Sequence, residues 1–175
     1  KELAEFVKTM SLHGLGGEFA DRYNRNSNSR PVVTNLPGIK ANMNDVSSSI
    51  IIQQLSKVDT ILRNKKTIAR KYLYELEGKV EFLRINNFEE HSWHMFTILV
   101  EDRDNFVIKV KDAGVCVGVH YNPLLHLHPF YQKKYGYAKG DFPVAERISD
   151  MCVSLPIYPS MTDEEVEFVI KTVKD

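Results

Sequence analysis

Apolar residues recur at steps of three and four along the first half of the chain, the period of an α-helix that buries one face. One stripe predicts a helix over residues 1–10, which the glycines that follow should end. A longer stripe begins after Asn44 or Asp45, either of which can cap a helix, and it runs to Gly78 with a bend expected at 63–66. Its apolar positions are Ile51, Leu55, Val58, Ile61, Leu62, Ile68, Ala69, Tyr72, Leu73 and Leu76.

Three later segments have the composition of β-strands. Residues 94–100 (HMFTILV) and 115–121 (VCVGVHY) are rich in β-branched and apolar side chains, and residues 152–159 (CVSLPIYP) predict a shorter strand. Between the two helical stripes, residues 18–33 are rich in Asn, Ser and Arg and predict an exposed loop.

Helical patterns separate these strands. Residues 103–114 and 141–151 predict amphipathic helices, and residues 162–175 predict a final helix. Thr162 and Glu165 have the spacing of a capping box at its start. This order predicts an α/β (α+β) chain, in which a small sheet carries helices, rather than a complete doubly wound domain.

Composition and charge exclude some classes of partner. The 175 residues can form one substantial core, or a small domain plus part of another. Lys+Arg and Asp+Glu both number 23, so the formal net charge is zero. This balance argues against nucleic acid or an anionic membrane as the main partner. No apolar run is long enough to predict a membrane-spanning helix. Cys116 and Cys152 stand in apolar surroundings and predict buried free thiols, as expected in a reducing cytoplasm.

The densest candidate chemistry lies in residues 119–137 (VHYNPLLHLHPFYQKKYGY), which contain three histidines and five aromatic residues. The pair His126 and His128, with His91 and His94 earlier, could serve a metal site, but Pro129 disfavours a regular strand and no carboxylate stands at a fixed spacing. The histidines could equally pack against aromatic rings in a surface loop. A third interpretation is a surface for a sugar ring or another flat ligand.

A second candidate precedes the long helix. Lys40 and Asn42, in the segment GIKANMND, combine a cation and an amide donor beside a helix start, which is a composition suited to phosphate. A solvated loop before a helix is the alternative interpretation.

Six segments, taken together and in order, resemble the C-terminal part of the DegT/DnrJ-type (StrS-like) aminotransferases, pyridoxal-phosphate enzymes that aminate keto sugars on nucleotide carriers. The segments are MSLHGL, PGIKANMNDV, QQLSKVDTILRNKKTIARKYLYEL, HSWHMF, VHYNPLLHLHPFYQKKYGYAKGDFPVAE and SLPIYPSMTDEEVEFVI. The chain departs from the family pattern at Ile39, Ala41, Ser48 and Ser49, which leaves the choice of sugar open.

The resemblance implies a fold and a division of the chain. Residues 46–175 would form the C-terminal small domain of a fold-type I pyridoxal-phosphate transferase. Residues 1–45 would form the tail of the large cofactor-binding domain and a loop that crosses to the neighbouring subunit of a homodimer. The family's Schiff-base lysine lies upstream of the position of Lys1, so the chain is expected to be a fragment without a catalytic residue of its own.

The resemblance also implies roles for individual residues. Lys40 and Asn42 would bind the phosphate of the neighbouring subunit's pyridoxal phosphate. The residues implied to line the nucleotide-sugar site are His13, His94, His120, Tyr121, His126 and His128, and no residue is assigned to a metal.

The implied activity is transfer of an amino group, with glutamate as the expected donor, to a nucleotide-linked keto sugar for polysaccharide or deoxyamino-sugar biosynthesis. Two alternatives stay open at this point. One is a cofactor-dependent sugar dehydratase of the same family, in which histidine replaces the lysine. The other is a non-catalytic, histidine-rich module that binds a metal or another ligand.

Overall fold

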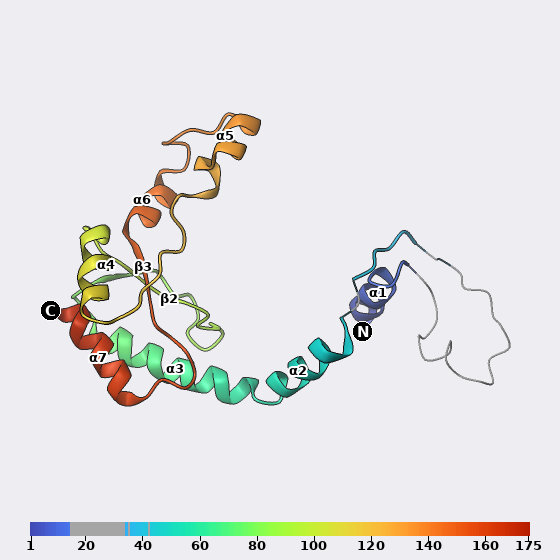
Figure 1. The fold of residues 1–175 in the computed structure, drawn as a ribbon, viewed down its shortest axis with the longest axis horizontal. Coiled ribbons are helices and arrows are strands. Elements are labelled where there is room, and N and C mark those ends of the chain that lie inside the picture. Colours follow the sequence, from blue (N-terminus) through green and yellow to red (C-terminus); the bar gives the residue numbers. More distant parts are fainter. Residues whose placement is uncertain (15–33, 35, 42) are drawn as a thin grey trace. The chain divides into compact units, whose positions relative to one another are not determined.

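The computed structural model describes residues 1–14, 34, 36–41 and 43–175 (Figure 1). The chain divides into two compact units, Lys1–Ser56 and Lys57–Asp175. The loop predicted over residues 18–33 and the candidate residue Asn42 lie outside the described residues.

The first unit contains the helices α1 (Glu2–Met10) and α2 (Asp45–Leu55), which confirms both predicted helix starts. Asn44 caps α2, because its side-chain oxygen accepts the N–H of Ser47 at 2.8 Å. Neither of these two helices buries any of its residues. The apolar side chains that they expose are Leu3, Phe6, Val7, Val46, Ile50, Ile51, Ile52 and Leu55.

The long predicted helix is interrupted earlier than expected. Helix α2 ends at Leu55 and α3 spans Val58–Glu75, so the predicted bend at 63–66 is wrong. The Ser56 hydroxyl donates to the Gln53 carbonyl at 2.8 Å, and such local side-chain bonds compete with continuation of a helix. Residues 63–66 stay helical because Arg and Lys are good helix formers.

The second unit is built on a three-stranded antiparallel sheet of order β1-β2-β3. Its strands are β1 (Glu81–Phe82), β2 (Phe96–Leu99) and β3 (Cys152–Leu155). One face of β2 and β3 is apolar, since Phe96 pairs with Leu155 and Ile98 with Val153. These four residues belong to the hydrophobic core together with residues of α3 and of α7 (Asp163–Lys174). The two helices lie side by side in Figure 1.

Strand membership differs from the prediction in one place. Residues 115–121 do not form a strand, and only Gly118 pairs with Ser154 of β3, as an isolated antiparallel bridge. The chain turns away at His120 and Tyr121, which limits the pairing to this one residue. The third strand is instead β1, which is too short to show an alternating pattern in the sequence.

The remaining helices confirm their predictions in position. Helices α4 (Arg103–Asp112) and α6 (Pro143–Met151) lie within the predicted segments, and the capping box at the start of α7 is present. The histidine-rich loop adds a 3₁₀ turn (Leu125–Leu127) and the short helix α5 (Pro129–Tyr135). No helix in the described part of the chain is long and apolar enough to cross a membrane.

The two cysteines differ in exposure. Both are free thiols, as predicted, and Cys152 is buried in β3. Cys116 is exposed, so the prediction of burial is wrong for this residue. The neighbours Val115 and Val117 are buried, and in an extended segment alternate side chains point to opposite sides.

Candidate functional site

The loop that carries Lys40 is fixed by backbone pairing with the turn that ends α1. The N–H of Ile39 donates to the Met10 carbonyl at 2.8 Å, and the N–H of His13 donates back to the Ile39 carbonyl at 3.0 Å. The N–H of Ala41 donates to the Ser11 carbonyl at 2.9 Å, and Leu12 and Lys40 form an antiparallel bridge. The position of the Lys40 backbone is therefore set by main-chain hydrogen bonds on both sides of it.

Two glycines allow this close approach. A Cβ atom on Gly38 would lie 2.6 Å from the Met10 carbonyl oxygen, and one on Gly14 would lie 2.7 Å from the Leu36 carbonyl carbon. Gly14 also has φ +72°, a conformation that side chains disfavour. The crossing of the two segments thus depends on the absence of side chains at both positions.

The Lys40 side chain fits an anionic group. It is exposed, and it lies four residues before Asn44, which caps the eleven-residue helix α2. The first amides of a helix carry partial positive charge, which a lysine ammonium reinforces. His13 is also exposed, with φ +59°, and its backbone N–H belongs to the pairing that holds this loop. The predicted role of Asn42 is not tested, because this residue lies outside the described residues.

In the second unit, His120 is held against the sheet. Its Nδ1 lies 2.9 Å from the Ser154 hydroxyl oxygen. Its ring meets the Tyr121 ring edge-on, with 5.1 Å between centroids. The carbonyl of Tyr121 accepts the Ser149 hydroxyl at 2.6 Å, and both His120 and the Tyr121 side chain are exposed. The structure therefore brings these two predicted residues together at one surface.

His126 has a different environment. Its side chain is buried, and its Nε2 lies 3.0 Å from a carboxylate oxygen of Glu146. The same carboxylate accepts the N–H of Gly140 at 2.9 Å and that of Phe142 at 3.3 Å. These N–H groups and His126, with Gly140 the largest contributor, hold the pKa of Glu146 below its usual value although burial acts to raise it. The buried contact between His126 and Glu146 thus joins the histidine-rich loop to α6.

His128 and His94 are exposed. The carbonyl of His128 accepts the N–H groups of Tyr131 and Gln132, both at 3.0 Å, and so begins α5. His94 lies in the bend before β2, and within the described residues its side chain makes no hydrogen bond that ties it to the loop. Residues 1–14, 34, 36–41 and 43–175 contain no group of three His, Cys, Asp or Glu side chains that could hold a metal ion.

Aromatic rings form an exposed surface on the histidine-rich loop. The rings of Tyr131 and Tyr135 are stacked with 6.2 Å between centroids, and the Lys134 ammonium lies 5.2 Å from the Tyr135 centroid. Flat rings beside a cation suit a ligand that combines planar or apolar faces with negative charge. The exposed aromatic residues of this loop and its flank are Tyr121, Phe130, Tyr135, Tyr137 and Phe142.

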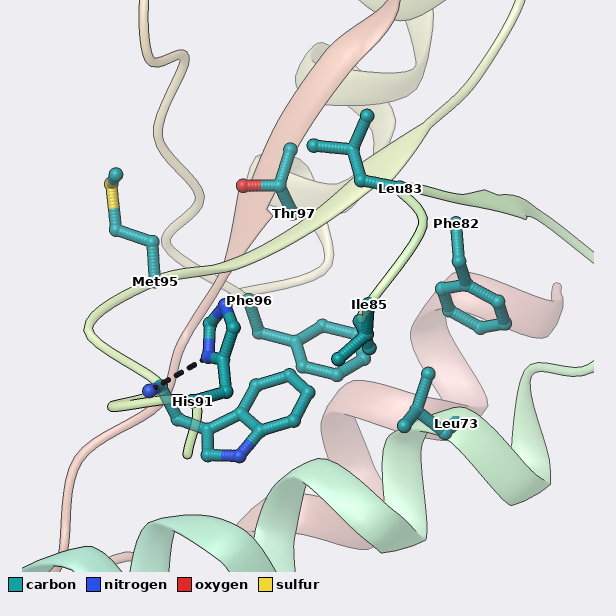
Figure 2. Close-up of a pocket in the computed structure, with 9 residues that line it drawn as sticks. Leu73, Phe82, Leu83, Ile85, His91, Met95, Phe96 and Thr97 are labelled. Atoms are coloured by element: carbon teal, nitrogen blue, oxygen red, sulfur yellow. Dashed lines mark hydrogen bonds between the residues drawn. The ribbon is translucent and has the colours of Figure 1, made fainter. Parts of the chain in front are cut away.

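A separate cavity of about 90 Å³ lies beside β1 and β2 (Figure 2). Its lining is mainly apolar, and His91 Nδ1 accepts the backbone N–H of Trp93 at 3.0 Å at one side. The buried Nε1 of Trp93 has no hydrogen-bond partner among the described residues. The residues labelled in the figure are Leu73, Phe82, Leu83, Ile85, His91, Met95, Phe96 and Thr97, none of which is among the residues expected to bind the cofactor or the sugar nucleotide.

Three residues that organise the site were missed by the sequence analysis. Glu146 anchors the loop, Ser154 contacts His120, and Ser149 holds the Tyr121 backbone. Glu146 has a local signal, since it stands in the first turn of a helix that begins with proline. The two serines have none, because their partners lie 28 and 34 residues away in the chain.

Comparison with known proteins identifies the family of the chain. The model of the DegT/DnrJ/EryC1/StrS aminotransferase family matches residues 1–174. The uncharacterized protein MJ1066 of Methanocaldococcus jannaschii is 36% identical over 99% of this chain and 47% of its own length. The spore coat polysaccharide biosynthesis protein SpsC of Bacillus subtilis is 32% identical over 100% of this chain and 47% of its own length. The chain therefore spans about half the length of the curated relatives it matches.

Solved structures show the same fold. Spr1654 of Streptococcus pneumoniae, assigned as a sugar aminotransferase and solved in a PMP form, matches with a TM-score of 0.79 and 26% identity. The match covers 99% of this chain and 44% of that one. DesV of S. venezuelae matches in fold with a TM-score of 0.83 at 22% identity, over 99% of this chain and 43% of that one. The chain has the α/β fold of the matching part of these pyridoxal-phosphate-dependent enzymes, and it belongs to the DegT/DnrJ/EryC1/StrS aminotransferase family.

Proposed function

We propose that the complete protein is a pyridoxal-phosphate-dependent aminotransferase. It transfers an amino group, with glutamate as the donor, to a nucleotide-linked keto sugar in cytoplasmic polysaccharide or deoxyamino-sugar biosynthesis. The family match over residues 1–174 supports the reaction class, and the likeness to SpsC supports the polysaccharide setting. The structural observation that carries the proposal is the glycine-dependent loop that presents Lys40 before the start of α2.

In this proposal the two parts of the chain have separate tasks. Residues 1–45 contribute the end of the cofactor-binding domain and a loop that serves the neighbouring subunit of a homodimer, while residues 46–175 form the C-terminal small domain. Lys40 and Asn42 bind the phosphate of pyridoxal phosphate. His13, His94, His120, Tyr121, His126 and His128 border the nucleotide sugar, with His126 acting from within the loop through Glu146.

The chemistry divides between the cofactor and these residues. Pyridoxal phosphate, when bound, supplies the electron sink for exchange of the amino group. Lys40 and the helix start hold the phosphate, and so fix the position of the reacting part of the cofactor. The exposed aromatic rings and His120 hold the sugar nucleotide by stacking and hydrogen bonding, which orients the keto carbon.

The first test of the proposal measures cofactor affinity. In the complete protein, Lys40→Ala should weaken binding of pyridoxal phosphate by about ten- to a hundredfold, because a charge-assisted contact contributes about 1.5–3 kcal/mol. Binding of pyridoxal, which lacks the phosphate, should change by less than about twofold. Lys111→Ala provides a matched control, since Lys111 is exposed in α4 of the other unit.

Equal losses for pyridoxal phosphate and pyridoxal would show that Lys40 does not bind the phosphate. A second measurement addresses the substrate: with glutamate alone the complete protein should release about one equivalent of 2-oxoglutarate per bound cofactor, and it should release more only when a nucleotide-linked keto sugar accepts the amino group. Turnover without a net transfer of nitrogen to the sugar would instead identify the sugar dehydratase reaction.

A further inference from the structure

A short chain of polar side chains crosses the sheet on the face opposite the hydrophobic core. Residues Thr97 of β2 and Ser154 of β3 are direct partners in the antiparallel register, and their hydroxyl oxygens lie 3.3 Å apart. The Ser154 oxygen also lies 2.9 Å from Nδ1 of His120. The chain of hydrogen bonds therefore begins inside the sheet and ends at an exposed histidine ring.

Ser154 is fixed by the backbone as well as by its side chain. Its N–H donates to the Gly118 carbonyl at 2.8 Å, and its carbonyl accepts the N–H of Gly118 at 3.1 Å. The residue is only 6% exposed, so its hydroxyl needs partners within the protein. Thr97 and His120 are those partners, which places the hydroxyl at a defined point beside Nδ1 of the His120 ring.

Gly118 makes room for that ring. A Cβ atom at this position would lie 2.6 Å from Cε1 of His120 and 3.2 Å from its Nε2, so the imidazole lies against the Gly118 backbone. The Tyr121 ring borders it edge-on at 5.1 Å. The His120 ring is thus bounded by Gly118, Ser154 and Tyr121, and within the described residues no protein group hydrogen bonds its Nε2.

We propose that Ser154 is a positioning residue that fixes the orientation and the tautomer of His120, so that Nε2 carries the proton and is offered to the sugar nucleotide. In this arrangement the Ser154 hydroxyl acts as the donor in its 2.9 Å contact with Nδ1, and the Thr97 hydroxyl acts as the donor in its 3.3 Å contact with Ser154; the distances fix the partners, and the direction of both bonds belongs to the proposal. A neutral imidazole that accepts at Nδ1 has its N–H at Nε2. An N–H donor suits the hydroxyl and phosphate oxygens of a sugar nucleotide, so this inference rests on the proposed function.

The first readout is independent of activity. Nitrogen NMR of the complete, cofactor-loaded protein with ring-labelled histidine reports the tautomer of each imidazole, and His120→Ala assigns the signal. We expect an Nε2–H tautomer for His120 in the wild type, a mixture of tautomers in Ser154→Ala, and recovery in Ser154→Thr, which keeps the hydroxyl. Ser160→Ala is the matched control, since Ser160 is exposed and lies outside this chain of hydrogen bonds.

The second readout separates orientation from packing. Ser154→Ala should raise KM for the keto sugar about two- to tenfold, as expected for one misplaced neutral hydrogen bond, and leave the half-reaction with the amino donor unchanged. A merely structural role would slow both half-reactions together. If Ser154→Ala does not fold, Thr97→Val serves in its place, because it removes the neighbouring hydroxyl at nearly constant volume.

The outcomes distinguish the positioning role of Ser154 from the place of His120 in the proposed sugar site. An unchanged His120 tautomer in Ser154→Ala, or an Nδ1–H tautomer in the wild type, would overturn the role of Ser154. A changed tautomer with an unchanged KM for the sugar, in both Ser154→Ala and His120→Ala, would support the role of Ser154 and remove His120 from the proposed sugar site.

Discussion

Replacing Gly38 by alanine should release the loop that presents Lys40. The added Cβ would lie 2.6 Å from the Met10 carbonyl oxygen and from the His13 carbonyl carbon, whereas ordinary contacts begin near 3.4 Å. The nearest atom is the Gly14 backbone nitrogen at 2.1 Å, and all three atoms belong to the backbone, so one of the two segments has to move by about 1.3 Å. Since the φ angle of Gly38 lies outside the left-handed region, the substitution adds a clash without backbone strain.

The size of the effect follows from the bonds that this movement breaks. Three backbone hydrogen bonds join the segments: Ile39 to Met10 at 2.8 Å, Ala41 to Ser11 at 2.9 Å and His13 to Ile39 at 3.0 Å. Each contributes about 0.5–1.5 kcal/mol, so the loss of two or three destabilises the pairing by about 1–4.5 kcal/mol. Lys40 then no longer has a fixed position, and we expect affinity for pyridoxal phosphate to fall about tenfold or more.

The assay is a spectroscopic titration of pyridoxal phosphate into the complete apoprotein, with the melting temperature measured in parallel. Gly78→Ala is the control: it has φ +71° and open space around its Cβ, so it should cost about 1 kcal/mol of stability and leave cofactor affinity unchanged. If Gly38→Ala binds pyridoxal phosphate within twofold of the wild type, the close crossing of these segments does not position Lys40.

Three further predictions concern the second unit, each measured on the complete protein. Because its neighbours lower the pKa of Glu146, this carboxylate contributes stability that is present above about pH 4.3 and lost as the pH falls further. Glu146→Gln should lower the melting temperature at pH 7, and the melting temperature of this variant should fall less steeply below about pH 4.3. If it falls as steeply as that of the wild type, Glu146 is not the source of the loss of stability in acid. Tyr72→Phe removes the hydroxyl that donates to the Pro156 carbonyl at 2.9 Å, and should cost about 1 kcal/mol in urea unfolding at unchanged m-value. Thr162→Ala removes the cap of α7 and should also cost about 1 kcal/mol, whereas Thr162→Ser should recover most of it; equal losses in both variants would contradict the capping role.

Local patterns predicted the helices well, for a physical reason. Helices α1, α4, α6 and α7 are each set by an apolar period and by turn or capping residues within the same segment. The capping box of Thr162 and Glu165 needs no information from elsewhere in the chain, and it forms as predicted. The interruption of the long helix was predicted at 63–66 but lies at Ser56. A serine in a helix can form competing hydrogen bonds, which the hydropathy pattern does not show.

Sheet membership and side-chain partners were harder to predict because they depend on distant residues. The segment 115–121 has strand composition, yet the turn at His120 reduces its pairing to Gly118. The histidines of the loop look equivalent in the sequence, but the structure separates them. His126 is buried against Glu146, twenty residues away, while His120 is exposed on Ser154. Neither partner could be inferred from spacing along the chain.

The two parts of the candidate site are held by different kinds of interaction, and this difference bears on how each tolerates change. The Lys40 loop is fixed by backbone hydrogen bonds and by glycines, so nearly any substitution at Gly14 or Gly38 disturbs it. In the second unit, side chains hold the histidine-rich loop, since Ser154 contacts His120 and Glu146 contacts His126, and single substitutions can alter such contacts. In the proposed enzyme, substitutions in the second unit would therefore change the choice of sugar while the Lys40 loop stays the same. The departures at Ile39 and Ala41 fit this division: they lie within the backbone-paired segment, where hydrogen bonds run through the main chain and leave the side chains free to vary.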